Sequence, residues 1–435
     1  MNIKTVTVLG ANGTMGCNVA GIFAAFGNAQ VYMISRTMDK SIKSIEKAAK
    51  TVKADAIKKN LIPADYSMLE SCLLKSDLIF ESVEENFETK FELNRRIASI
   101  VGNDKIICTG TSGILIKSLA EAYPEAMRKN YMGLHFYNPP YNMTLCELIP
   151  SVYTNSNVVC EVKNYITNIL YRTAVVVKDS PAFLGNRIGF QFINEALQYA
   201  VQYKDNGGID YIDGILGQFT GRNMPPLSTS NFVGLDVHKA IVDNIYENTN
   251  DYARDTFILP QFAANLIKEG KLGRKTKEGL YKFEISEGGI KKSLVYDIAS
   301  QNYRERIQYS FPFAVKMIDA FKIGDYEKAF NTLITNHSNE AEICLEFLLK
   351  YVLYSLKVSF LIGDGIHSAD DVMATGFNWC PPLAVIQALG GLNIFKSLVY
   401  ERINKKIVSQ IDIETLIKNV EDSKYDYRRY FNAKY

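Results

Sequence analysis

Residues 4–26, KTVTVLGANGTMGCNVAGIFAAF, hold the pattern that decides the fold of the first part of the chain. The run from Lys4 to Leu9 predicts a buried strand, and the apolar run from Val19 to Phe26 predicts a helix. The glycines between them permit a tight turn and let backbone N–H groups at the helix start approach a pyrophosphate. Strand, glycine-rich turn and helix in this order therefore predict a dinucleotide-binding site. Its expected residues are Gly10, Asn12, Gly13, Thr14, Met15 and Gly16.

Strand and helix patterns alternate onward from this turn as far as residue 180. Such alternation is typical of a mostly parallel sheet covered by helices. Beyond it the chain reads as helical, apart from a polar stretch at 286–300 that we expect to be a linker. We therefore predict an α/β Rossmann-like domain over residues 1–180, followed by all-α domains over residues 181–290 and 300–435.

The predicted strand from Gln30 to Ser35 ends in a serine that is followed by Arg36. An NAD-binding domain normally has an acid at this place, where it binds the 2′-hydroxyl of the adenosine ribose. A serine removes the repulsion that an acid exerts on a 2′-phosphate, and an arginine adds a cation. We expect Ser35 and Arg36 to bind the cofactor, which is NAD or NADP, and this pair favours NADP.

A second motif, MGLHFYNPPYNMTLCELIPS at residues 132–151, places one histidine and one acid on two apolar runs. His135 ends the first run, a Pro-Pro turn follows, and Glu147 lies in the second run, twelve residues further on. Two strands joined by such a turn can bring an imidazole and a carboxylate within hydrogen-bond reach. A carboxylate on one ring nitrogen fixes the tautomer, which suits a general base. The alternative is a core histidine and an edge glutamate that never meet.

This motif resembles the active-site segment of the L-3-hydroxyacyl-CoA dehydrogenases, and two further segments resemble the same family: DSPAFLGNR at 179–187 and LGRKTKEGLY at 272–281. The resemblance is strong over residues 1–285 and weaker over 345–395. It implies His135 as the catalytic base and Glu147 as its orienting partner. It also implies a helical C-terminal part similar to that of 6-phosphogluconate dehydrogenase.

Four more site residues follow from the resemblance alone. Ser112 and Asn186 fall on the family positions that contact the substrate oxygen and the substrate carbonyl, and Glu85 and Lys90 fall near the nicotinamide ribose. The chain also departs from the family pattern. The glycine spacing is G-x-x-G-x-x-G instead of G-x-G-x-x-G, and Gly110-Thr-Ser-Gly113 stands where the family has N-T-S-S. We expect the extra residue to reshape the loop around Asn12.

An internal repeat is visible in the second half of the chain. Residues 360–391 resemble residues 192–234: each segment carries an acidic pair or near-pair, a glycine, a Pro-Pro and a closing apolar-Gly unit. Some family members carry two such helical domains, so an internal duplication is implied. We expect the two helical domains to pack together, as a pseudo-dimer within the chain or in a homodimer.

The composition excludes some classes of protein and leaves others open. The chain has 435 residues, a net charge of +2 and 22% charged residues. This small net charge does not indicate a nucleic acid or a membrane as a partner. No apolar run reaches the length of a membrane span. Seven cysteines without paired spacing indicate a reducing compartment. The chain enters a strand directly, so we expect no signal peptide and a cytoplasmic location. No metal site is expected.

The expected function is that of a 3-hydroxyacyl-CoA dehydrogenase, with an acyl-CoA as its substrate and fatty acid β-oxidation as its setting. No hydratase segment precedes the first strand, so a fused multifunctional chain is not expected. Two alternatives remain at this level: a related hydroxy-acid dehydrogenase that does not use CoA, and a catalytically silent binding protein of the same fold.

Overall fold

The computed structural model describes residues 3–285 and 291–431, and its contacts divide the chain into two compact units. The first unit comprises residues 1–183 with 362–364, and the second comprises residues 184–361 with 365–435. The predicted α/β domain thus falls within the first unit, whereas the two predicted helical domains share the second. Among the described residues no single helix is long and apolar enough to cross a membrane, although two helices at 382–388 and 392–402, bent by 93° at their break, meet that test as a pair.

One eight-stranded sheet, in the order β3-β2-β1-β4-β5-β6-β7-β8, forms the centre of the first unit. Strands β1 to β6 are parallel, β7 runs antiparallel to β6, and β8 runs parallel to β7, so the predicted mostly parallel sheet is confirmed. The strand order reverses between β1 and β4, where open α/β sheets bind ligands at their carboxyl ends. The strands are β1 (Thr5–Leu9), β2 (Gln30–Ser35), β3 (Leu61–Asp65), β4 (Leu78–Glu81), β5 (Ile106–Thr109), β6 (Tyr131–Phe136), β7 (Leu145–Pro150) and β8 (Thr173–Val176).

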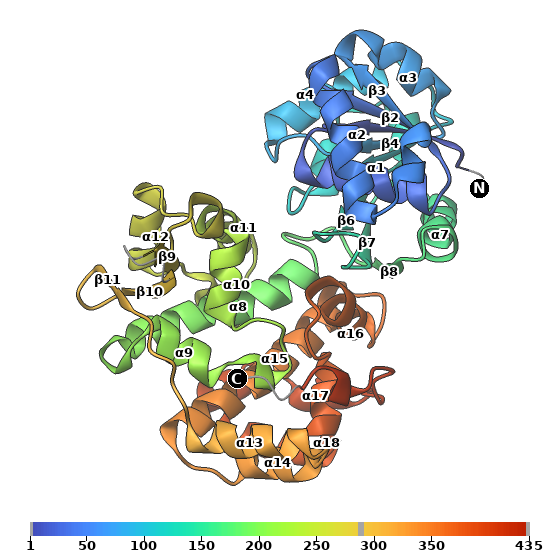
Figure 1. Cartoon of the computed structure of the whole chain (residues 1–435). Helices are drawn as coiled ribbons and strands as arrows, with labels where there is room; N and C mark the ends of the chain where they lie inside the picture. Colours follow the sequence, from blue (N-terminus) through green and yellow to red (C-terminus); the bar gives the residue numbers. More distant parts are fainter. Residues whose placement is uncertain (1–2, 286–290, 432–435) are drawn as a thin grey trace. The chain divides into compact units, whose positions relative to one another are not determined.

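Helices α1 (Thr14–Ala25) and α2 (Met38–Val52) pack against each other and against the first strands of this sheet (Figure 1). Phe23 of α1 is fully buried and meets Phe80 of β4 edge to face, with 6.1 Å between the ring centroids. Thr37 caps the N-terminus of α2, and its side chain accepts a hydrogen bond from the N–H of Lys40. The other helices of this unit are α3 (Leu69–Lys75), α4 (Phe87–Ala98), α5 (Ile116–Ala120), α6 (Glu125–Arg128) and α7 (Ser156–Asn164).

In the second unit, α8 (Gly185–Gln202) from the first predicted helical domain packs against α15 (Asn339–Ile362) from the second. Glu195 and Lys350 form a buried ion pair of 2.8 Å between them, and the rings of Phe192 and Phe347 meet edge to face at 5.1 Å. The expected packing of the two helical segments within one chain is therefore observed. The other helices are α9 (Ile209–Ile215), α10 (Pro226–Val233), α11 (Leu235–Asn248), α12 (Gln261–Lys268), α13 (Pro312–Lys322), α14 (Tyr326–Ile334), α16 (Ser368–Val372), α17 (Pro382–Ala388), α18 (Leu392–Arg402), α19 (Lys405–Val408) and α20 (Ile413–Ile417).

The two segments of the internal repeat form the same local structure, in which a buried aspartate accepts a backbone N–H at the start of a helix. Asp213 accepts a hydrogen bond from the N–H of Leu227 at 2.7 Å, in the first turn of α10. Asp370 accepts one from the N–H of Leu383 at 2.9 Å, in the first turn of α17. Each helix begins at the second proline of a Pro-Pro pair, and each acid is buried. The aspartates and prolines that reveal the repeat in the sequence are therefore the residues that start equivalent helices.

The predicted linker at 286–300 is wrong for residues 291–297, which form a strand. Strand β10 (Lys291–Asp297) pairs with β9 (Tyr281–Ile285) and β11 (Asn302–Glu305) in an antiparallel sheet. The prediction failed because polar residues flank the short run Leu294-Val-Tyr296, whose three side chains are all buried in the structure. Residues 286–290 of the expected linker lie outside the described residues.

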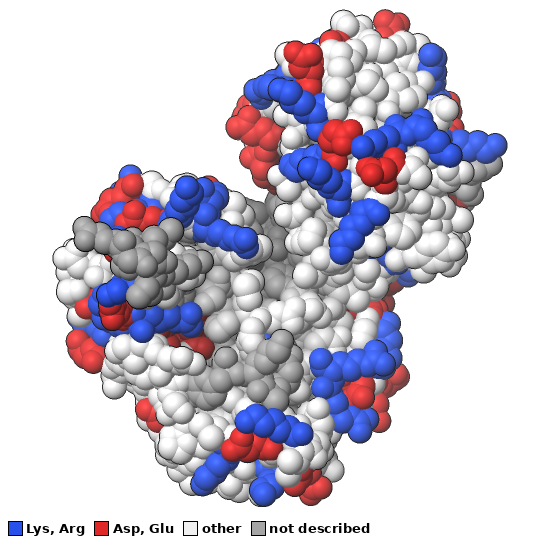
Figure 2. All heavy atoms as spheres, in the orientation of Figure 1, with Lys and Arg blue, Asp and Glu red and all other residues white. Residues whose placement is uncertain are grey.

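Charged side chains of both signs are interspersed on the face of the molecule that Figure 2 shows. This distribution agrees with the formal net charge of +2. An anionic ligand must therefore be held by a few local cations and by backbone N–H groups, not by the overall field of the protein.

Candidate active site and cofactor cavity

The turn after β1 has glycine where its geometry requires glycine. Gly10 has a φ of +78°, and a Cβ there would lie 2.4 Å from the backbone oxygen of Ser82. A Cβ on Gly16 would lie 2.5 Å from the backbone oxygen of Gly10. The first and last glycines of the motif therefore keep the roles of a tight turn and a close helix approach. The extra residue of the motif is accommodated around Asn12, which is exposed, and Gly13 closes the turn by donating to the oxygen of Gly10 at 2.9 Å.

A cavity of about 390 Å³ lies at the carboxyl ends of β1 to β4. Of the predicted cofactor residues, Gly10, Asn12, Gly13, Ser35 and Arg36 line it. Thr14, Met15 and Gly16 form the first turn of α1 instead. Sequence reasoning missed the remaining lining residues. They are Tyr66, Ser82, Val83, Glu84, Thr89 and Leu93. Ser82, Val83 and Glu84 directly follow β4 at the switch point, and that position was the signal that could have found these three.

The end of β2 fits a nucleotide ribose better than it fits a closed protein interior. Ser35 is 1% exposed, and its hydroxyl has no hydrogen-bond partner although it lines the cavity. A buried hydroxyl without a partner costs free energy, because burial removes its bonds to water. A ligand atom in the cavity would satisfy it. The bare backbone at Gly10 and the unpartnered hydroxyl beside the cavity are compatible with a bound dinucleotide.

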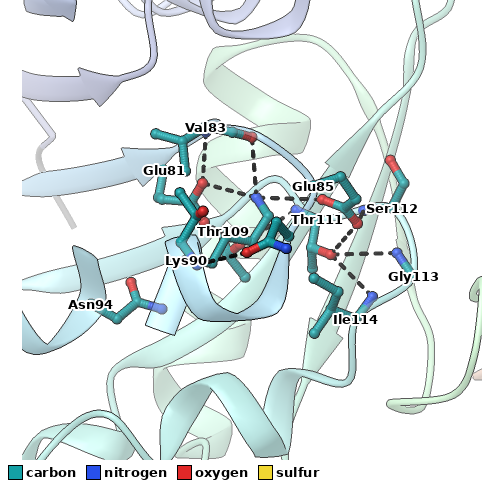
Figure 3. A network of polar contacts seen from close by, with 12 residues as sticks. Glu81, Val83, Glu85, Lys90, Asn94, Thr109, Thr111, Ser112, Gly113 and Ile114 are labelled. Carbon is teal, nitrogen blue, oxygen red and sulfur yellow. Dashed lines mark hydrogen bonds and ion pairs between the residues drawn. The ribbon is translucent and has the colours of Figure 1, made fainter. Parts of the chain in front are cut away.

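Lys90 of α4 is fully buried beside this cavity and forms the centre of a polar network (Figure 3). Its ammonium group donates to Glu81 at 2.9 Å and to the oxygen of Val83 at 3.5 Å, and it lies 3.4 Å from Glu85. Glu81 in turn accepts from the hydroxyl of Thr109 at 2.7 Å. The side chain of Lys90 is fully buried, so Lys90 acts by holding Glu85, whose side chain is 44% exposed.

Glu85 links this network to Ser112. One of its oxygens accepts from the hydroxyl of Thr111 at 2.5 Å and from the backbone N–H of Ser112 at 2.8 Å (Figure 3). The Thr111 hydroxyl oxygen also accepts from the N–H groups of Gly113 and Ile114. Glu85 and Thr111 thus hold the loop at residues 110–113, in which glycines stand where the family has an Asn and a second Ser. The structure brings Glu85, Lys90 and Ser112 together in one network, and their contacts with the cofactor and the substrate stay predictions.

His135 and Glu147 face each other directly across the antiparallel pair β6–β7. Nδ1 of His135 lies 2.7 Å from Oε2 of Glu147, and both side chains are buried. Tyr137 donates its hydroxyl to the same carboxylate oxygen at 2.9 Å, and the ring of Phe183 lies 5.4 Å from the imidazole. A carboxylate against Nδ1 favours the tautomer with its proton on Nδ1, which leaves Nε2 as the proton acceptor.

The dyad and the Ser112 loop lie at the same edge of the sheet. Strands β5 and β6 are parallel neighbours, and Ser112 follows β5 while His135 is near the carboxyl end of β6. Asn186 is the second residue of α8 in the other unit, where its side chain is buried. Its contact with a substrate carbonyl stays a prediction.

Comparison with known proteins identifies the family. Residues 5–180 match the NAD binding domain of 3-hydroxyacyl-CoA dehydrogenase, and residues 183–283 match the C-terminal domain of the same family. Human mitochondrial hydroxyacyl-coenzyme A dehydrogenase is 30% identical over 298 residues, which are 65% of this chain and 92% of that protein. The chain belongs to the 3-hydroxyacyl-CoA dehydrogenase family, and its first unit is a domain that uses NAD or NADP.

Three further proteins are similar to this chain, and the first two extend the likeness beyond the first 285 residues. A Bacillus subtilis protein described as "Probable 3-hydroxyacyl-CoA dehydrogenase" is 28% identical over 323 residues, 73% of this chain but only 39% of that relative. A 3-hydroxybutyryl-CoA dehydrogenase from Escherichia coli shares the fold over 97% of this chain and 98% of its own, with a TM-score of 0.68 at 19% identity. An (S)-3-hydroxybutyryl-CoA dehydrogenase from Ralstonia eutropha is 27% identical, with a TM-score of 0.57 over 64% of this chain and 98% of its own.

Proposed function

We propose that this protein is a 3-hydroxyacyl-CoA dehydrogenase, which transfers hydride reversibly between C3 of a 3-hydroxyacyl-CoA and a nicotinamide cofactor. The observation that carries the proposal is the buried His135–Glu147 pair of 2.7 Å at the edge of a dinucleotide-binding sheet. The family gives the reaction class, and this pair supplies the acid and base that the reaction needs. Nothing in the folding of an antiparallel strand pair requires a histidine and a glutamate opposite each other.

The cofactor, when bound, accepts or supplies the hydride. His135 takes the proton of the C3 hydroxyl on Nε2 as C3 is oxidised, and it returns that proton in the reverse direction. Glu147 holds the imidazole through Nδ1 and stabilises the imidazolium that forms. Tyr137 fixes the carboxylate from the other side, and Phe183 covers one side of the imidazole against water. General acid–base help of this kind contributes on the order of 10²–10⁴ in rate.

Ser112 is the proposed hydrogen-bond donor to the C3 oxygen, and the family resemblance assigns Asn186 to the thioester carbonyl. Support for Ser112 comes from Glu85, which holds the backbone of the serine at 2.8 Å. The side chain of Glu85 is 44% exposed, and in this proposal the same carboxylate that holds the Ser112 loop also reaches the nicotinamide ribose. The site is thereby arranged before the ligands arrive.

The test is turnover of acetoacetyl-CoA and of 3-hydroxybutyryl-CoA, followed through the absorbance of the reduced nicotinamide. The native chain is expected to use both, and His135→Gln is expected to lose about 10²–10⁴ in kcat while cofactor binding is kept. His238→Gln is a control, because His238 is buried between Ser230 and Asn194 in the other unit. Near-normal turnover by His135→Gln would remove this residue from the mechanism. Turnover of free 3-hydroxy acids without turnover of CoA esters would favour the alternative dehydrogenase.

The assembly and the compartment complete the proposal. The packing of α8 against α15 supports a pseudo-dimer built within one chain, for which size-exclusion chromatography with light scattering is expected to give a monomer mass. All seven cysteines are free, which supports a reducing compartment such as the cytoplasm.

A further inference from the structure

Two features of the cofactor cavity are unexplained by NAD binding alone: the hydroxyl of Ser35 and the cation of Arg36. Both residues line the cavity, directly at the end of β2. Ser35 is 1% exposed with an unpartnered hydroxyl, and Arg36 is exposed and makes no ion pair or side-chain hydrogen bond within the described part of the chain. An unsatisfied donor and an unpaired cation at one position are complementary to an anion with several oxygens.

Tyr66 and a second arginine lie beside this pair. Tyr66, which follows β3, lines the same cavity. Arg96 donates to the backbone oxygen of Tyr66 at 3.5 Å and lies 5.8 Å from its ring centroid. Burial and the Glu81 carboxylate raise the pKa of Tyr66, while Arg36 and Arg96 act in the opposite direction, so both guanidinium groups are close enough to this phenol to influence its charge.

The acids near β2 do not occupy the place of an NAD-binding carboxylate. Asp65 stands opposite Ser35 in the pairing of β2 and β3, but one of its oxygens accepts both the N–H and the hydroxyl of Ser67, at 3.0 and 2.6 Å. Neither Asp65 nor Asp39, the first acid after Arg36, lines the cavity. Glu84 does line it, but it follows β4, and β1 lies between β2 and β4 in the sheet.

We propose that Ser35, Arg36 and Tyr66 form a subsite for the 2′-phosphate of an adenosine ribose, so that this chain takes NADP(H) in preference to NAD(H). In this arrangement the Ser35 hydroxyl donates to one phosphate oxygen, and Arg36 pairs with two others. An acid at position 35, which would accept the 2′-hydroxyl of NAD, would repel the same phosphate. The inference rests on the proposed function only in requiring that the first unit binds a nicotinamide dinucleotide.

The direct test measures the binding affinity of adenosine nucleotide fragments and does not depend on turnover. Calorimetric titration of the full chain with 2′,5′-ADP and with 5′-AMP isolates the 2′-phosphate, because the fragments differ only in that group. One charge-assisted contact corresponds to about a 10- to 100-fold difference in affinity. We expect 2′,5′-ADP to bind at least about 10-fold more tightly than 5′-AMP. Arg36→Ala should remove most of this difference, and Arg36→Glu should reverse it, while 5′-AMP binding is kept.

Arg95→Ala is the matched control. Arg95 is also an exposed arginine of the first unit, but it pairs with Glu92 on α4 and does not line the cavity, so its loss should leave the difference unchanged. The kcat/KM ratio of NADPH over NADH should follow the binding data. Equal binding of the two fragments by the native chain, or a difference that survives in Arg36→Ala, overturns the subsite. Absence of binding by both fragments and by both reduced dinucleotides overturns dinucleotide binding itself.

Discussion

The buried ion pair of Lys90 and Glu81 offers a sharp test of how the cofactor edge of the sheet is held. Both side chains are 0% exposed, and their charged atoms lie 2.9 Å apart. Lys90→Met keeps most of the side-chain volume and replaces the charged end with an uncharged thioether. Glu81 is then left as a buried carboxylate whose remaining donors are the N–H of Val83 and the hydroxyl of Thr109, each at 2.7 Å.

Breaking a buried ion pair on one side typically costs about 3–5 kcal/mol, because it leaves an uncompensated charge. The two donors that remain on Glu81 place the expected loss at the lower end, about 3 kcal/mol. Combining Lys90→Met with Glu81→Gln removes both charges and keeps an acceptor for Val83. The double variant is therefore expected to recover about half of the loss, which corresponds to a coupling of about 1–2 kcal/mol between the two positions.

Native-state hydrogen exchange of the β4 and β5 amides measures the effect in the first unit alone, independently of how the second unit unfolds. Arg95→Ala on the exposed side of α4 is the control and should change protection by less than about 0.5 kcal/mol. A loss below about 1 kcal/mol in Lys90→Met, or a double variant as unstable as the sum of the two single variants, would refute the reasoning.

Two further predictions concern the dyad and the second unit. Tyr137→Phe removes the hydroxyl that donates to Glu147 at 2.9 Å. Steady-state kinetics should show kcat reduced about 5-fold with little change in KM, because the lost hydrogen bond corresponds to about 1 kcal/mol of positioning. A change in KM alone would contradict a role of Tyr137 in holding the dyad. Burial raises the pKa of Asp370 from 3.8 to about 6. Between these two pKa values the folded chain keeps a proton on Asp370 that the unfolded chain releases. The protonated carboxyl therefore contributes to the free energy of unfolding in full below pH 3.8, and this contribution is lost as the pH rises through about 6. Asp370→Asn keeps an acceptor for the N–H of Leu383 and should remove up to about 3 kcal/mol of this pH dependence. Denaturant unfolding at about pH 4 and pH 7 measures it, and an unchanged slope in the variant would speak against the shift.

The sequence predicted those parts of the structure that local patterns determine. Gly10 and Gly16 were correctly placed because their backbone positions exclude a side chain, and such positions mark the sequence directly. The reach between His135 and Glu147 was predictable because two apolar runs around a Pro-Pro turn form adjacent antiparallel strands, whose pairing places the two residues opposite each other.

The parts that were missed depend on partners distant in sequence. Strand β3 contains Pro63, which argues against a strand unless it lies at the edge of a sheet, as β3 does. The burial of Lys90 follows from Glu81, nine residues earlier, and from the closure of α4 over β4, which no local pattern shows. Tyr66 enters the cofactor cavity only because β3 lies next to β2.

The position of His135 and Glu147 on paired strands has a consequence for which changes in the chain the pair can withstand. The hydrogen-bond ladder between β6 and β7 sets the distance between the two side chains, and residues 138–144 between the strands do not. A change in the length or composition of that connection is therefore expected to leave the geometry of the proton-transfer pair intact. A slip of one residue along the ladder would instead turn one partner to the opposite face of the sheet, so the register of the strands, and not the loop, holds the pair.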